Sequence, residues 1–230
     1  MEMRVRSILY CAGFVVAVSV SGSVATAQQS NGALVFGRSM EKRFVGLAKE
    51  PAIAARAPGK TGLALMAAAG DSAVYFIDDA ALRDLGDLFA ASGSRAPADV
   101  CAQLYLSGGD GFQKAFVSLL TVSDSALADR WADLMTRVTR AGILRPPFGR
   151  IASSDEVTLA IQSIVGGQSS ADRARLRRGA SKAGSPDDVC FFTVTTFRGI
   201  AHLPLDRGGP VMRAMLRGVK PRLPLPEQPG

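Results

Sequence analysis

The sequence predicts a mainly α-helical protein, folded as a compact bundle of about seven or eight helices with one disulfide. Three observations favour this class. Apolar residues recur at helical spacing along most of the chain. Several of these segments begin at a capping residue and end at glycine or proline. Two distant cysteines, Cys101 and Cys190, follow matching residues, Pro-Ala-Asp-Val in one case and Pro-Asp-Asp-Val in the other.

The middle of the chain holds the most regular helical pattern, which begins after Ser123. We expect Ser123 to be the N-cap of this helix. Apolar residues then recur at steps of four, three and four residues: Leu127, Trp131, Leu134 and Val138. Gly142 and the Pro146-Pro147 pair end the pattern. An earlier helix over 79–91 places three large apolar residues on one face: Leu82, Leu85 and Phe89.

The second half contains two strong helix starts. Ser153 and Glu156 have the spacing of a capping box, in which each side chain bonds the other residue's backbone N–H. Ser185-Pro186-Asp187-Asp188 combines a cap, a proline at the first helical position and acids that face the helix dipole. Residues 190–197 have strand propensity, but this start and the helical spacing of their apolar residues predict a helix.

The segment 62–77 allows two interpretations. Gly70-Asp71 could be the turn of one short β-hairpin, because apolar residues flank it on both sides. The alanine-rich run before this turn could equally form a helix, since alanine has the highest helix propensity. Both alternatives stay open on the sequence alone.

The N-terminal residues 1–27 have the pattern of a secretory signal peptide. Arg4 and Arg6 precede an apolar stretch over 8–20, and a small-x-small cleavage pattern closes it at 25–27. We therefore expect a periplasmic or secreted protein, with a single helical domain over 28–219 and a proline-rich flexible tail over 220–230. Arginine far outnumbers lysine, as in many high-GC bacterial genomes, which favours a Gram-negative periplasm.

The predicted compartment bears on the cysteines. Cys11 lies in the apolar stretch and would leave with the signal peptide, so Cys101 and Cys190 would be the two cysteines of the mature chain. Oxidising compartments preserve disulfides. We therefore expect these two residues to form one disulfide.

The positive charge of the chain is concentrated near its C-terminal end. Residues 28–141 hold 12 basic and 12 acidic side chains, whereas residues 142–230 hold 13 basic and 7 acidic ones. The densest cluster is the candidate anion-binding segment 173–182: Arg173, Arg175, Arg177, Arg178 and Lys182. These side chains would spread around a helix, which is typical of a solvated surface. They could also attract an anionic envelope polymer or lipid. Export and the lack of interleaved aromatic residues argue against nucleic acid.

Catalytic motifs are weak in this chain. Residues 54–61 resemble a relaxed phosphate-binding loop, but Ala54 replaces its first glycine, and only 17 residues separate Thr61 from the acidic Asp78. Gly70-Asp71-Ser72 resembles the nucleophile block of GDSL-type esterases, but position 199 is a glycine where that family places an acid before the histidine, here His202. One histidine and two paired cysteines are too few for a zinc site. We assign no catalytic residue, no metal and no cofactor.

The function that the sequence favours is therefore general. We expect an exported helical binding or structural module with an envelope protein or an anionic polymer or lipid surface as its partner. Two alternatives stay open. One is a cell-envelope hydrolase whose site is not visible in the sequence, and the other is an electrostatic binder that acts through the segment 173–182.

Overall fold

The computed structural model describes residues 31–70, 72–106, 110–181 and 184–218. These residues form eleven α-helices and one short 3₁₀-helix, η1. In chain order they are α2 (Asn31–Ala48), α3 (Pro51–Arg56), α4 (Leu63–Ala69), η1 (Ala73–Phe76), α5 (Asp79–Gly93), α6 (Ala98–Leu106), α7 (Asp110–Val122), α8 (Ser125–Leu144), α9 (Ser154–Gly166), α10 (Ser170–Ala180), α11 (Pro186–Ala201) and α12 (Leu205–Leu216). The predicted mainly helical class is confirmed. The predicted signal peptide and the predicted tail from residue 220 lie outside the described residues.

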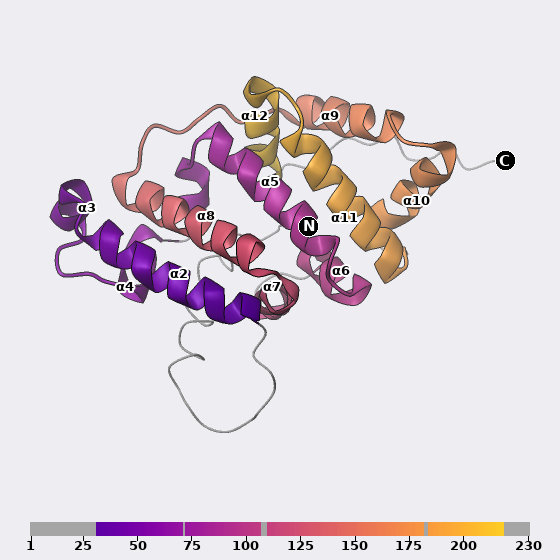
Figure 1. Cartoon of the computed structure of the whole chain (residues 1–230). Helices are drawn as coiled ribbons and strands as arrows, with labels where there is room; N and C mark the ends of the chain where they lie inside the picture. The colour runs from indigo at the N-terminus through magenta and orange to yellow at the C-terminus, as the bar shows by residue number, and fades with distance from the viewer. Residues whose placement is uncertain (1–30, 71, 107–109, 182–183, 219–230) are drawn as a thin grey trace.

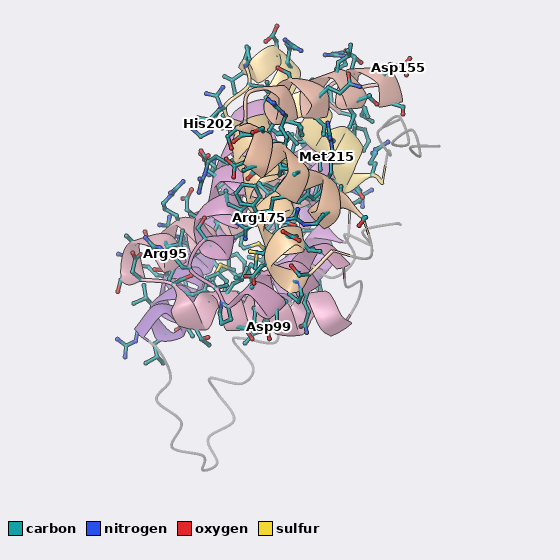
Figure 2. The ribbon with its side chains drawn as sticks, turned by 90° about the vertical axis from the view of Figure 1, so that its right-hand side faces the viewer. Arg95, Asp99, Asp155, Arg175, His202 and Met215 are labelled. Atoms are coloured by element: carbon teal, nitrogen blue, oxygen red, sulfur yellow. A yellow bond between two sulfur atoms is a disulfide. The ribbon has the colours of Figure 1, made fainter. Side chains whose placement is uncertain are left out.

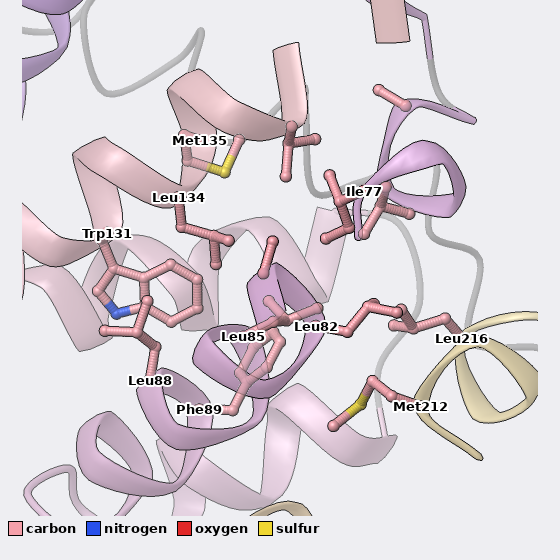
Figure 3. Close-up of a cluster of buried hydrophobic side chains, with 14 of the residues drawn as sticks. Ile77, Leu82, Leu85, Leu88, Phe89, Trp131, Leu134, Met135, Met212 and Leu216 are labelled. Carbon is pink, nitrogen blue, oxygen red and sulfur yellow. The ribbon is translucent and has the colours of Figure 1, made fainter. Parts of the chain in front are cut away.

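Helix α5 runs through the middle of the bundle, with α8 on one side and α11 on the other (Figure 1). Its apolar face is the predicted one, and Leu82, Leu85 and Phe89 are all buried. The ring of Trp131 on α8 meets Phe89 edge-on at 5.2 Å between ring centroids. Figure 3 shows this layer, in which α8 and α12 face α5 from different sides. The buried indole N–H of Trp131 donates a hydrogen bond to Ser92 at 2.9 Å, so this polar group is satisfied inside the core.

Helices α2 and α3 come in addition to the seven or eight helices that the sequence predicts. Helix α2 lies along α8 (Figure 1) and buries four large apolar side chains at steps of four, four and three residues: Phe36, Met40, Phe44 and Leu47. On its partly exposed side, Arg43 pairs with Asp129 at 3.0 Å and with Asp133 at 2.8 Å, both on α8. The apolar steps are a helical signal in the sequence itself.

The segment 62–77 is helical where the structure describes it. The alanine-rich run forms α4, and the residues after it form η1; the described residues contain no strand, so the hairpin alternative is wrong. Gly62 and Gly70 flank α4 with φ values of 50° and 75°, a left-handed region that glycine enters without steric cost. The high helix propensity of alanine, together with a glycine at each end that tolerates positive φ, explains why this run forms a helix and not a strand of a hairpin.

The local helix starts follow the predicted chemistry with one correction. Ser153 and Glu156 form the capping box of α9, and Ser185 accepts a hydrogen bond from the Asp188 N–H at the start of α11. Helix α8, however, is capped by Asp124 and not by Ser123. Asp124 accepts from the Leu127 N–H at 2.8 Å, whereas Ser123 is buried and donates to the Leu119 carbonyl. A carboxylate one residue later thus takes the capping position.

A disulfide joins Cys101 on α6 to Cys190 on α11, as predicted, with 5.2 Å between the Cα atoms. Gly93 on α5 lies against this bridge, and a Cβ atom built there would come within 3.2 Å of the Cys101 sulfur. The bridge therefore ties together a corner at which α5, α6 and α11 meet. Within the described part of the chain, no helix combines the length and the apolar character needed to cross a membrane.

Candidate functional site

The predicted anion-binding segment forms α10, and most of its arginines have partners within the fold. Arg178 donates to both carboxylate oxygens of Asp188 at 2.9 and 3.2 Å. Arg175, which is labelled on the face shown in Figure 2, lies 3.4 Å from Asp188 and stacks over the Phe191 ring. Arg173 donates to the Gln168 carbonyl at 2.9 Å. The contacts of Arg175 and Arg178 dock α10 on α11.

The positive charge of this segment is only partly neutralised within the fold. Arg177 is exposed and makes no hydrogen bond or ion pair within the described residues, while Lys182 lies outside them. Arg175 and Arg178 share the single carboxylate of Asp188, and Arg173 bonds a carbonyl. Three acids lie close to the four arginines of α10: Asp172, Asp187 and Asp188. Anion binding by α10 stays a prediction, and the ion pairs give these arginines a structural task instead.

Several carboxyl groups have pKa values below their ordinary range. The hydrogen bond from Arg178 lowers the pKa of Asp188, and the one from Ser39 lowers the pKa of Asp129. Hydrogen bonds from the backbone N–H groups of Leu127 and Ser153 lower the pKa values of Asp124 and Glu156, respectively. A general acid needs a proton at neutral pH. These four groups are held ionised and serve as caps and ion-pair partners.

The lone histidine caps a helix end. His202 follows α11, is exposed, and places its Nδ1 atom 2.7 Å from the Arg198 carbonyl. One residue of the esterase-like block 70–72, Asp71, lies outside the described residues. Among the described residues, no group of three or more metal-ligating side chains could hold a metal ion.

A different surface carries one exposed aromatic side chain and two half-buried ones. We call it the aromatic platform, and it consists of Tyr75, Phe76, Phe148 and Arg217. Phe148 stacks on Phe76 with 4.3 Å between ring centroids and 23° between ring planes. The guanidinium of Arg217 lies 4.9 Å from the centre of the Tyr75 ring and 5.0 Å from that of Phe148. Phe148 is 51% exposed, so half of this large apolar side chain faces solvent.

The inner edge of the platform is fixed by Tyr75. Its hydroxyl donates to the Leu216 carbonyl at 3.3 Å, which connects η1 to the end of α12. Partial burial raises the pKa of the Tyr75 phenol, and the nearby Arg217 charge opposes that shift. The phenol therefore stays a neutral donor at physiological pH.

The loop that carries Phe148 leaves α8 in an unusual conformation. Arg145 ends α8 with φ of 47°, and it is the one non-glycine residue with positive φ among those the structure describes. Glycine is the residue normally found there, because a side chain costs energy in this region. Pro146 and Pro147 follow, and their rings fix the backbone just before Phe148. The chain thus reaches Phe148 with few free torsions.

The other end of this loop is fixed by a buried arginine. Arg213 on α12 is 3% exposed and donates to the carbonyls of Ile77 at 2.8 Å and Arg150 at 3.3 Å. Its guanidinium also pairs with Asp79 at 2.5 Å. Gly149 lies directly against it, since a Cβ atom built on Gly149 would be 2.4 Å from the Arg213 Cζ. Arg213 therefore holds the residue next to Phe148 against η1 and the start of α5.

Sequence reasoning missed this surface. The Pro146-Pro147 pair indicates only the end of α8, and Phe148 belongs to no periodic pattern. An aromatic residue directly after two prolines in a predicted loop is a weak signal of an exposed ring. The partner ring, Phe76, lies 72 positions earlier, so the stack becomes visible only in three dimensions.

Chemically, the platform combines flat apolar rings with a cation. Such a surface suits side chains that stack, such as proline or aromatic rings, placed beside a hydrogen-bond acceptor for the guanidinium. Comparisons with known proteins give no further guide, because no family model, no curated protein and no solved structure matches this chain.

Proposed function

We propose that this chain is an exported binding module, acting in the periplasm or outside the cell, that contacts a protein partner through the aromatic platform. The observation that carries this proposal is Phe148, which is half exposed and yet held in place by stacking on Phe76. Single exposed apolar residues are common on protein surfaces. Phe148 differs from an isolated exposed residue because it stacks on Phe76 and lies beside Arg217.

The composition of the platform supports a protein partner. Aromatic residues and arginine are enriched at protein interfaces, where a few of them supply most of the binding energy. A preformed platform also avoids the entropy cost of ordering side chains on association. The two prolines before Phe148 and the buried Arg213 behind it provide this order before a partner arrives.

Two features support export. The N-terminal residues have the pattern of a signal peptide, and the disulfide between Cys101 and Cys190 is a bond that oxidising compartments preserve. Fusing residues 1–30 to alkaline phosphatase, which becomes active only after export, tests the compartment. Active fusion protein is expected, and an inactive cytoplasmic fusion would refute export.

The binding proposal is tested by affinity capture from an envelope extract with three forms of the mature chain. The wild type and a Leu159→Ala control are expected to retain the same partner, because Leu159 is a 60% exposed apolar residue of α9 outside the platform. Phe148→Ala is expected to lose it. Circular dichroism verifies that all three are folded. Equal capture by all three forms would contradict the proposed contact.

A further inference from the structure

The charge around the aromatic platform indicates what kind of segment it binds. Arg145 is exposed and makes no ion pair within the described residues, and the same holds for Arg217. Arg145 lies three residues before Phe148, at most about 11 Å of extended chain. Arg56 adds a third positive charge, since its guanidinium donates to the carbonyls of Ile143 and Leu144 and pairs with no described carboxylate.

The acids near this surface have partners other than the platform arginines. Asp79 pairs with the buried Arg213, and Glu156 pairs with Arg150 at 2.6 Å while it caps α9. Asp78 is exposed and caps α5, where it accepts from the Ala81 N–H at 2.7 Å. The platform thus presents apolar rings beside the guanidinium groups of Arg217 and Arg145, with which no described acid pairs.

Arg217 also has the geometry to accept a carboxylate. Its Cζ atom lies over both the Tyr75 and the Phe148 rings. A guanidinium carries five N–H donors, so those that point away from the rings stay available. None of them makes a hydrogen bond within the described residues. A carboxylate beside these donors could take two parallel hydrogen bonds, the strongest arrangement for an arginine.

We propose, building on the proposed function, that the platform binds an acidic segment of a partner protein that carries proline or aromatic side chains. A ring of the segment packs on the exposed half of Phe148, and a neighbouring Asp or Glu pairs with Arg217. Arg145 and Arg56 add longer-range attraction, which raises the association rate at low salt.

The test uses the ¹⁵N-labelled mature chain, with its disulfide intact, and three synthetic peptides that differ only in charge. Their sequences are Glu-Glu-Pro-Phe-Pro-Glu-Glu, the same peptide with Gln for Glu, and the same peptide with Lys for Glu. The acidic peptide is expected to shift the amide resonances of Tyr75, Phe76, Phe148 and Arg217. Its affinity should exceed that of the glutamine peptide by about fivefold, the effect of one partly exposed ion pair. The lysine peptide should produce no shift.

Two matched variants locate the charge effect. Arg217→Gln should abolish the preference for the acidic over the glutamine peptide. Arg207→Gln should keep it, because Arg207 is an exposed arginine at the start of α12 that contacts no platform ring. Equal affinity for all three peptides, binding of none of them, or shifts confined to α10 would overturn the proposed acidic segment.

Other occupants of the platform are outcomes of the same experiment. A peptide with the sequence of residues 219–230, phosphatidylglycerol vesicles, or self-association seen by sedimentation could produce the expected shifts in place of the acidic peptide. Each of these results would overturn the inference. If all three peptides bind equally and Phe148→Ala abolishes that binding, only the acidic preference fails. If partner capture is indifferent to Phe148, the proposed function itself fails.

Discussion

The guanidinium of Arg213 in α12 pairs with the carboxylate of Asp79, the first residue of α5, across 134 positions of sequence. The arginine side chain is almost fully buried, and its second amino group donates to the Ile77 carbonyl. One side chain thus joins α12, α5 and the residue that follows η1. The loop that carries Phe148 is held by the same guanidinium through the Arg150 carbonyl.

This arrangement predicts a large stability loss for Arg213→Met. The substitution keeps the apolar volume but leaves the Ile77 and Arg150 carbonyls without their donor and Asp79 without its partner. We expect the free energy of unfolding to fall by about 3 kcal/mol. Arg130→Met is the matched control on the exposed side of α8, where the change should stay below about 0.5 kcal/mol. Urea denaturation followed by circular dichroism measures the free energy of unfolding of both variants. An equal loss in the two variants would contradict the role of Arg213 in joining these segments.

The disulfide should strengthen a fold that forms without it. Cys101 and Cys190 are 89 positions apart, and closing a loop of that length lowers the entropy of the unfolded chain. The chain-entropy model gives about 4.5 kcal/mol for such a loop. Urea unfolding of the Cys101→Ala/Cys190→Ala double variant should therefore give a cooperative transition at a lower midpoint. A helix content near zero in the absence of denaturant would contradict this prediction, because the apolar core does not depend on the bridge.

The pair between Arg178 and Asp188 predicts a specific acid sensitivity. The folded-state pKa of Asp188 is lower than the ordinary value, so the ionised carboxylate favours the folded state. This contribution is fully present above about pH 4, the ordinary pKa of aspartate, and is lost as the pH falls through the lower folded-state value. The Asp188→Asn variant has no carboxylate at this position and therefore lacks this contribution to stability. The difference in melting temperature between the wild type and this variant should shrink as the pH falls below about 4, and a constant difference from pH 7 to pH 2 would contradict the account.

The positive φ of Arg145 predicts a stabilising substitution. Arg145→Gly removes the steric cost of a side chain in the left-handed region, and the free energy of unfolding should rise by about 0.5–1 kcal/mol. Arg130→Gly, in the interior of the same helix, should have the opposite sign and cost about 1 kcal/mol. Thermal unfolding compares the two variants. A loss of stability in Arg145→Gly would mean that the Arg145 side chain makes a favourable contact that outweighs the strain.

Helix starts could be predicted from the sequence because their chemistry is local. Ser153 with Glu156, and Ser185 with Pro186, act over three residues, and the structure contains both caps. The prediction of Ser123 as the N-cap of α8 is wrong by one residue. Asp124 is an equally good capping residue, and only one of two adjacent residues can occupy the N-cap position. Helix α2 also had a usable signal in the spacing of its buried residues.

The aromatic platform could not be predicted in this way. Phe148 stacks on Phe76 from a distant segment, and its exposure depends on how a non-periodic loop is held. Arg213 is the main support of that loop, and a charged side chain is expected at the surface. Its burial follows from partners on three other segments, none of which is near it in sequence.

The central claim, that Phe148 is the contact point for a partner, is tested most directly by site-specific photo-crosslinking in intact cells. The photoreactive amino acid p-benzoylphenylalanine replaces either Phe148 or Leu159, two exposed apolar residues on different surfaces. We predict one discrete adduct from position 148 and none from position 159, with mass spectrometry identifying an acidic segment of the partner at the crosslink. Adducts of equal yield from both positions, or no adduct from position 148, would contradict the claim.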